Sequence, residues 1–106
     1  MPDLSEPIGS LAGFEWDAGN SQKNWASHRV SQAESEEVFF NRPVFVLEDA
    51  KHSGRERRYN VLGRTHGDRL LSVIFTIRGD RARVISARPM SRKERSAYAQ
   101  VPPEAP

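Results

Sequence analysis

Two tight turns in the second half of the chain constrain its fold more than any other feature. They lie at residues 66–68 (HGD) and 78–80 (RGD), and the most apolar stretch of the chain, LLSVIFTI, runs between them within residues 69–77. Glycine beside aspartate is typical of a turn. Strands joined by so few residues must be antiparallel, because a parallel pair needs a long crossover connection. The sequence therefore predicts consecutive antiparallel strands over 57–63, 69–77 and 81–88.

Helices are predicted on both sides of these strands in the chain. SQAE at 31–34 and SRKE at 91–94 are capping boxes, in which the serine and glutamate side chains each satisfy a free backbone amide at the start of a helix. Asp17 resembles the N-cap of an earlier helix, although the glycine, asparagine and serine at 19–21 weaken that helix. The expected helices cover residues 18–28, 32–41 and 92–100.

Together these elements predict an α+β fold. Residues 44–48 add a short strand before the three already named, and Pro89 ends the last strand because proline cannot donate to a ladder. Residues 13–16 could form a further short edge strand. We therefore expect an antiparallel four-stranded sheet with two N-terminal helices and one C-terminal helix packed on it.

One domain is expected, over residues 13–100. Residues 1–12 contain two prolines, two serines and a glycine, which predicts a flexible arm, and residues 101–106 predict a flexible Pro-rich tail. The chain has no cysteine for a disulfide, no apolar run long enough to span a membrane, and no secretory signal pattern at its start. The expected location is the cytoplasm.

Charge is divided unevenly along the chain, although the formal net charge is only +2. Residues 1–50 carry three basic and nine acidic side chains, whereas residues 51–106 carry thirteen basic and five acidic ones, and eleven of those basic residues are arginine. Arginine can bind two phosphate oxygens at once. We expect the second half to meet a polyanion such as RNA and the first half a basic partner. The alternative is that these arginines are scattered over the surface, are solvated, and bind no partner.

Histidine, arginine and tyrosine are the residues left to carry chemistry. His28, His52 and His66 match no metal-ligand spacing, the chain has neither a Gly-rich phosphate loop nor a nucleophile elbow, and no cofactor is expected. RNA supplies its own nucleophile, the 2′-hydroxyl, so a protein can cleave RNA by moving protons with histidine and stabilising the phosphorane with arginine. DNA lacks that hydroxyl, which makes this route specific for RNA.

Arg88 is the first candidate for such a site. It ends the last predicted strand beside the C-terminal helix, and strict alternation of side chains would place it on one face with Val84 and Ser86. The alternative is that Arg88 pairs with Glu94 or Glu56 and fixes the helix.

A second cluster combines a histidine, a carboxylate and an arginine at His52, Glu56 and Arg57. The alternative interpretation is that these residues belong to a solvated loop and carry no chemistry. His28 could instead be a helix-end histidine that faces the C-terminal dipole, and Tyr98 could simply pack.

Many residues between 14 and 99 follow one familiar order and spacing. In the opening segment they are FEWD at 14–17, Asn24, His28, Val30 and VF at 38–39. In the middle they are His52, Glu56, Arg57, Gly63, Gly67 and TIR at 76–78. At the end they are RVISAR at 83–88, Glu94, Arg95 and Tyr98. This pattern resembles the BrnT toxin family, and the resemblance implies a RelE-like ribonuclease fold and a bacterial toxin that cleaves RNA without a metal and inhibits translation.

The resemblance also implies a protein partner. Toxins of this kind are neutralised by a tightly bound BrnA-like antitoxin, which usually dimerises through a ribbon-helix-helix DNA-binding domain. Operator DNA would then be contacted only through the antitoxin, and no membrane partner is expected.

Carried over by position, the resemblance assigns five candidate catalytic residues. His28 would transfer protons, with His52 as second choice, and Arg57 and Arg88 would grip the scissile phosphate. Glu56 would orient an arginine or act as a base, and Tyr98 would bind the phosphate or stack on a base. The candidate RNA-binding residues are Lys23, Arg29, His52, Arg83 and Arg92.

Departures from the family pattern fall in the first helix. The family commonly has lysine where this chain has Asn20 and Ser27, and glycine where it has Arg29. Lys23 and Arg29 could substitute for the lysines, but they project differently because one residue along a helix is about 100° of rotation. The departures predict weakened cleavage or an altered preference. Two rival functions therefore stay open, a nucleic-acid-binding module without catalysis and a degenerate toxin whose arginines bind the antitoxin.

Overall fold

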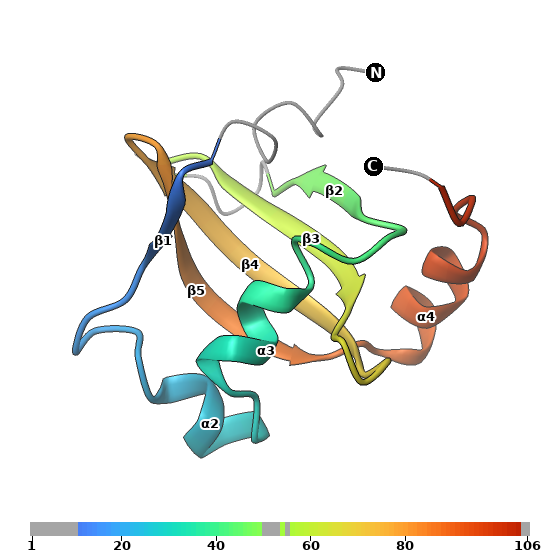
Figure 1. Ribbon diagram of the computed structural model, residues 1–106, viewed down its shortest axis with the longest axis horizontal. Helices are drawn as coiled ribbons and strands as arrows, with labels where there is room; N and C mark the ends of the chain where they lie inside the picture. Colours follow the sequence, from blue (N-terminus) through green and yellow to red (C-terminus); the bar gives the residue numbers. More distant parts are fainter. Residues whose placement is uncertain (1–10, 50–53, 55, 105–106) are drawn as a thin grey trace.

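A five-stranded sheet in the order β1-β5-β4-β3-β2 forms the centre of the protein (Figure 1). The computed structural model describes residues 11–49, 54 and 56–104. The strands are β1 (Gly13–Glu15), β2 (Phe45–Glu48), β3 (Arg58–Arg64), β4 (Leu70–Arg78) and β5 (Arg81–Pro89). The helices are α2 (Lys23–His28), α3 (Gln32–Glu37) and α4 (Arg92–Ala99).

The sheet confirms the four predicted strands and corrects the expected total. β2, β3, β4 and β5 pair antiparallel in chain order, as the tight turns predict. β1 adds a fifth strand that pairs parallel with β5, with Gly13 opposite Arg81 and Glu15 opposite Arg83. The sheet is therefore mixed, and not antiparallel and four-stranded. The parallel pair is possible because the rest of the domain provides the long crossover that it requires.

Both predicted capping boxes are present. The amide of Glu34 donates to Ser31 Oγ at 3.0 Å, and the amide of Ser31 donates to Glu34 Oε1 at 3.1 Å. Ser91 and Glu94 make the same reciprocal pair at the start of α4. The helix after Ser31 is shorter than predicted, because α3 ends at Glu37 and a turn follows over 38–40.

The first helix also differs from its prediction, because α2 begins at Lys23 and not at residue 18. Gln22 occupies the N-cap position and makes no side-chain capping bond. Asp17 accepts instead from the amide of Gly19 at 2.8 Å, within a turn that covers 18–22. Glycine, asparagine and serine at 19–21 disfavour a helix enough for the turn to replace it.

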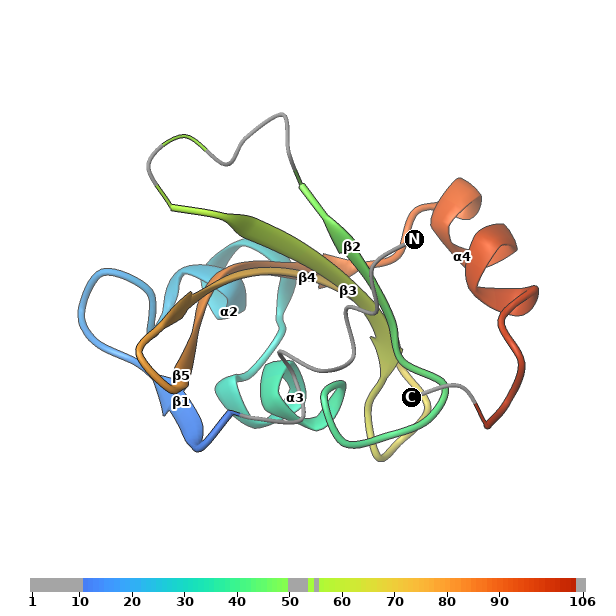
Figure 2. The ribbon, with the colours of Figure 1, turned by 90° about the horizontal axis from the view of Figure 1, so that it is seen from above.

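One face of the sheet, named here the covered face, lies under α3 and the turn after it (Figure 2). Val38 and Phe39 pack there with Val73 and Phe75 in the main core. Gly63 permits this close approach, because a Cβ at that position would lie 2.9 Å from the carbonyl oxygen of Val38. Any side chain at 63 would push the turn after α3 away from the sheet.

The opposite face, named here the open face, carries Asn60, Ser72, Ile74 and Ser86. Among the described residues, α4 is the helix that covers this face, and it does so at one end (Figure 2). Tyr98 of α4 packs there with Leu62 and Met90 in a second, smaller cluster. The expectation of helices packed on the sheet is met by helices on both faces, which leaves part of the open face accessible.

Several predictions concern residues outside the described range. Residues 1–10 of the expected arm, His52 and residues 105–106 of the tail belong to this group. Leu11 and Ala12 are described: Leu11 packs against the main core, and the amide of Ala12 donates to the carbonyl of Asp80 at 2.6 Å. No helix in the described part of the chain has the length and apolar character needed to cross a membrane.

Candidate nucleic-acid interface

A pocket of about 610 Å³ lies on the open face of the sheet. Among the described residues that line it, three are basic (Lys23, Arg58 and Arg88), and Glu48 and Asp49 are acidic. The remaining residues, which are aliphatic or small and polar, are Leu47, Asn60, Ile74, Ile85 and Ser86. Aliphatic side chains bordered by cations suit a ligand that has both an apolar ring and an anionic group, which is the chemistry of a nucleotide.

A β-bulge at Ile85 decides which side chains of β5 reach this pocket. Ser86 and Val84 pair with two adjacent residues of β4, so Ile85 between them has no partner on that strand. An extra residue reverses the alternation beyond it. Val84 is buried in the main core, whereas Ser86 and Arg88 line the pocket. The predicted common face of Val84, Ser86 and Arg88 is therefore wrong, and the bulge is the reason.

Glu94 holds the guanidinium of Arg88 at the edge of the pocket. Arg88 Nη1 lies 2.7 Å from Glu94 Oε1, and Nη2 lies 3.0 Å from Oε2. The amide of Ser91 donates to the same carboxylate at 2.8 Å. Burial alone would raise the pKa of Glu94, but the hydrogen bonds from Arg88 and Ser91 outweigh it and lower the pKa to about 2. The expected pairing of Arg88 with Glu94 is therefore present, and Glu56 binds elsewhere.

Two asparagines attach the segment around α2 to the outer edge of β5. β1 pairs only with residues 81–83, so the rest of that edge needs other partners. Asn20 Nδ2 donates to the carbonyl of Val84 at 3.0 Å, and the amide of Ala87 donates to Asn24 Oδ1 at 2.9 Å. The two asparagines are 4% and 5% exposed. This attachment places Lys23 at the pocket and gives the side chain of Asn20 a structural role.

His28 and Arg29 lie at the C-terminal end of α2 and do not line the pocket. Arg69 donates to the carbonyl of His28 at 3.0 Å and to that of Arg29 at 2.7 Å, which fixes this end of the helix. Arg29 has φ 54°, a left-handed conformation that favours glycine. Its guanidinium lies 5.4 Å from the centre of the Trp25 ring, and Trp25 is 51% exposed.

Arg57 and Arg58 are neighbours with different positions. The side chain of Arg57 is 76% exposed and lies 3.8 Å from Glu48, whereas Arg58 lines the pocket. Sequence reasoning chose Arg57 and missed Arg58 and Asn60. Apolar residues lie on both sides of β3, at Val61 and Leu62, so alternation does not tell which arginine faces the pocket.

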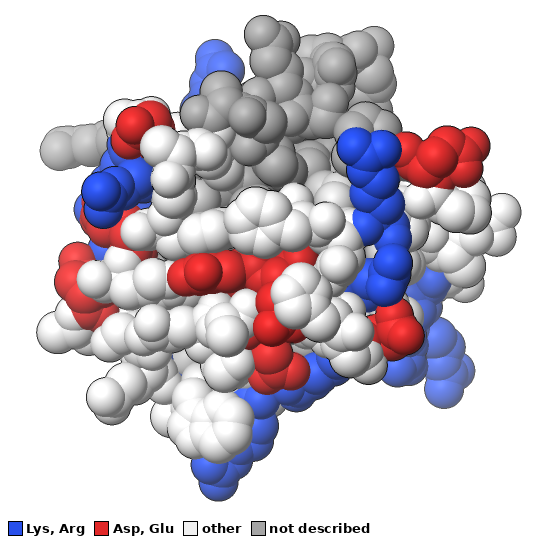
Figure 3. Space-filling model, in the orientation of Figure 1, with Lys and Arg blue, Asp and Glu red and all other residues white. Residues whose placement is uncertain are grey.

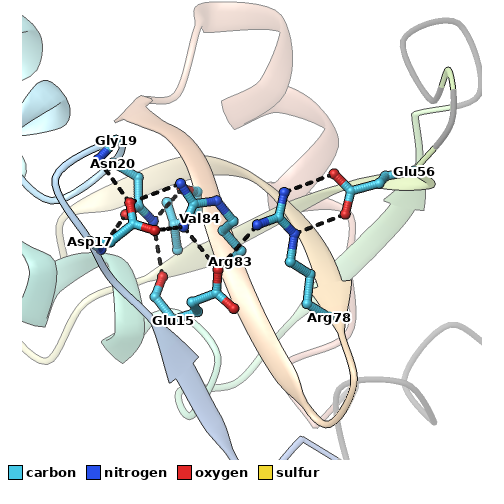
Figure 4. A network of polar contacts seen from close by, with 8 residues as sticks. All are labelled: Glu15, Asp17, Gly19, Asn20, Glu56, Arg78, Arg83 and Val84. Carbon is cyan, nitrogen blue, oxygen red and sulfur yellow. Dashed lines mark hydrogen bonds and ion pairs between the residues drawn. The ribbon is translucent and has the colours of Figure 1, made fainter.

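Arg83 belongs to an ion-pair network near the start of β5 (Figure 4). It donates to Asp17 at 2.8 and 3.0 Å and to Glu15 at 3.0 Å. Arg78 donates to Glu56 at 2.9 and 3.1 Å and reaches Glu15 at 3.2 Å. Hydrogen bonds from these arginines lower the pKa of Asp17 and of Glu56. The network ties β1 to β4 and β5, and neither Arg83 nor Glu56 lines the pocket.

Two further candidates belong to α4. Tyr98 is 8% exposed, its hydroxyl donates to the carbonyl of Pro43 at 2.7 Å, and burial raises its pKa. Arg92 is exposed at the first position of α4. Neither residue lines the pocket, and of the predicted residues that the structure describes only Lys23 and Arg88 do so.

The face that carries α3 has a different charge from the pocket. Figure 3 shows acidic side chains gathered at its centre, over α3, with basic side chains towards the margins. Glu36 accepts from Trp16 Nε1 at 2.7 Å, and Glu37 accepts from the amide of His66 at 2.9 Å. These glutamates help to hold the helix and the neighbouring loops in place.

The fold and the pocket define a small α+β protein whose sheet presents a partly basic pocket on one face. Residues 16–94 match the family described as ribonuclease toxin, BrnT, of type II toxin-antitoxin system, and the chain belongs to this family. The resemblance drawn from the sequence is thereby confirmed, and membership indicates a ribonuclease toxin with RNA as substrate and an antitoxin as partner. No curated protein matches the chain.

Proposed function

We propose that this toxin cleaves RNA without a metal ion at the pocket on the open face, and that it inhibits translation in the cytoplasm by doing so. One observation carries the proposal: Lys23, Arg58 and Arg88 come from three separate elements and line one pocket. Cations that converge on a small site can stabilise the charge that develops on a phosphate in the transition state.

In the proposed reaction the 2′-oxygen attacks the adjacent phosphorus and the bond to the 5′-oxygen breaks. The products are a 2′,3′-cyclic phosphate and a free 5′-hydroxyl. A base takes the proton of the 2′-hydroxyl, and an acid returns a proton to the 5′-oxygen. Arg88 binds the phosphate oxygens, and Lys23 and Arg58 add positive charge around them.

His28 remains the proposed proton-transfer group. It lies five residues after Lys23 on α2, about 7.5 Å along the helix axis, so it can transfer the proton only where the scissile phosphate lies at the α2 end of the pocket, between Arg88 and His28. Replacement of His28 by alanine should lower kcat by about 10²-fold or more, because a positioned proton-transfer group contributes a factor of that order. An unchanged kcat would remove His28 from the mechanism.

The proposed antitoxin is a BrnA-like protein with a ribbon-helix-helix domain, and operator DNA would bind only through it. An acidic antitoxin segment would occupy the pocket by mimicking the phosphates of RNA. RNA cleavage should then stop at one equivalent of antitoxin, and the Lys23→Ala variant should bind that antitoxin more weakly.

The decisive experiment incubates the partner-free protein with end-labelled RNA and excess chelator. The Arg88→Ala substitution should lower kcat by about 10²–10³-fold, because that is the effect of removing one donor to the transition state. Arg81→Ala is the matched control, because Arg81 is an exposed arginine at the other end of β5 and does not line the pocket. Equal activity of the two variants would place the chemistry elsewhere.

A degenerate toxin that binds RNA or antitoxin without cleavage is the second candidate. It is favoured by Asn20, whose side chain is committed to the sheet edge where the family commonly has lysine. Ser27 follows Lys23 by one helical turn, so a lysine at 27 would add a cation on the same side of α2. Binding without cleavage in the wild type, and cleavage by the Ser27→Lys variant, would support this second reading.

A further inference from the structure

The guanidinium of Arg88 has two edges, and each can hold two oxygens side by side. One edge is formed by Nη1 and Nη2, and the carboxylate of Glu94 takes it at 2.7 and 3.0 Å. The remaining hydrogen of Nη1 points to the carbonyl of Pro89 at 3.2 Å. No other contact of this guanidinium is found among the described residues, so the edge formed by Nε and Nη2 is left for a ligand.

The carboxylate of Glu94 is itself held in place by Ser72 of β4. Ser72, on the floor of the open face, is 1% exposed, and its Oγ lies 3.1 Å from Glu94 Oε2 and 2.9 Å from Asn60 Oδ1. A hydroxyl has one proton, and the charged carboxylate is the stronger acceptor. Donation to Glu94 then requires the amide of Asn60 to turn its Nδ2 towards Ser72, and the two ends of an amide differ little in shape. A chain of hydrogen bonds thus runs from Asn60 through Ser72 to Glu94 and Arg88.

We propose that Glu94, braced by Ser72, is a positioning residue that presents the Nε and Nη2 edge of Arg88 to two phosphate oxygens of RNA. This inference rests on the proposed ribonuclease function. A guanidinium held by a carboxylate on one edge needs no rearrangement when a phosphate arrives on the other. Pre-orientation of this kind contributes to the transition state more than to the binding of the ground state.

The main test compares cleavage kinetics of the Glu94→Gln variant with those of the wild type. Glutamine serves equally at the third position of a capping box, so α4 keeps its start while Arg88 loses its charged partner. We expect kcat to fall by about 10–100-fold, by analogy with the loss of residues that orient metal ligands, and KM to change little. Ser72→Ala should lower kcat by less, and Ser72→Thr should restore most of that loss because it keeps the hydroxyl.

Ser91→Ala is the matched structural control. It removes the other half of the capping box but leaves both contacts between Glu94 and Arg88 in place, so it should lower the unfolding temperature without lowering kcat. A loss of kcat in Ser91→Ala equal to that in Glu94→Gln would mean that Glu94 acts only through the stability of α4, and would overturn the proposal.

A second readout does not need cleavage. The NMR signal of Arg88 Nε–H, assigned by its loss in Arg88→Lys, should shift when a 2′-deoxy RNA analogue that cannot be cleaved is added. The shift should weaken in Glu94→Gln. An unmoved signal in the wild type, or a full shift and full kcat in Glu94→Gln, would overturn the inference. Absence of wild-type cleavage would refute the proposed ribonuclease instead, and the NMR titration would still decide the role of Glu94.

Discussion

The two faces of the sheet are built from alternate residues of the same strands, yet they differ in almost every property. On the covered face Val61, Val73 and Phe75 are 0% exposed and pack under α3. On the open face their neighbours in sequence Asn60 and Ile74 line a pocket. Adjacent residues of one strand therefore serve stability and ligand binding separately, because side chains alternate between faces. The bulge at Ile85 shows that one inserted residue can move a side chain from one role to the other.

The sharpest test of this comparison uses two adjacent residues of β4. Phe75→Ala should lower the free energy of unfolding by about 3–5 kcal/mol, because it leaves a cavity in the main core. Ile74→Ala, on the partly exposed open face, should cost about 1 kcal/mol, because only part of its area leaves water on folding. Urea unfolding measures both, and equal losses would contradict the division between the faces.

Low pH should reduce the stability of the protein through Glu94, which lies at the open face. The folded protein lowers the pKa of this carboxyl from 4.5 to about 2, so its contribution to stability is present above pH 4.5 and is lost as the pH falls towards 2. The difference in unfolding free energy between the wild type and Glu94→Gln should therefore shrink over that interval. A difference that stays constant from pH 6 to pH 2 would show that the charge of Glu94 contributes nothing.

The start of α3 should matter for stability and not for RNA. Ser31→Ala removes the side-chain acceptor of the Glu34 amide and should lower the free energy of unfolding by about 1 kcal/mol. RNA cleavage by the folded variant should stay at the wild-type rate, because α3 lies on the covered face. Ser27→Ala, at an exposed position inside α2, is the control and should be slightly stabilising. A fall in kcat for Ser31→Ala would couple the two faces.

The smallest expected change in the free energy of unfolding comes from substitutions at the end of α2. Arg29→Gly should raise the free energy of unfolding by about 0.5 kcal/mol, because glycine relieves the left-handed strain at φ 54° but loses the contact with Trp25. Ser27→Gly should lower it by a similar amount, because Ser27 has ordinary helical geometry. Thermal unfolding of both variants should therefore give shifts of opposite sign.

Local signals account for the parts of the fold that the sequence predicts. The Gly-Asp turns specify the antiparallel pairing of β3, β4 and β5, and the serine–glutamate pairs specify the starts of α3 and α4. The partner of β1 was not predictable, because pairing of Gly13 with Arg81 depends on residues that are far apart in the sequence. The extent of α2 was missed because a turn competes with the helix over 18–22.

The candidate site was predictable only in its cations. Lys23 and Arg88 are predicted site residues that line the pocket. At β3 the sequence favours Arg57, which is exposed, and it is the neighbouring Arg58 that lines the pocket. The bulge was missed because Ile85 is as good a strand residue as any other in β5. Ion pairs such as that of Arg83 with Asp17 likewise cannot be predicted from the composition, because they depend on which loops the fold brings together.

The attachment of the first elements to the last strand has a consequence for how the protein folds. The hydrogen bonds from Asn20 and Asn24 to β5 join residues that are 64 and 63 positions apart in the sequence. Closing a loop of that length costs chain entropy, and contacts between such distant residues slow folding. Lys23 and Arg88 line the same pocket only after this long loop has closed, so the pocket depends on the slowest kind of contact in the fold.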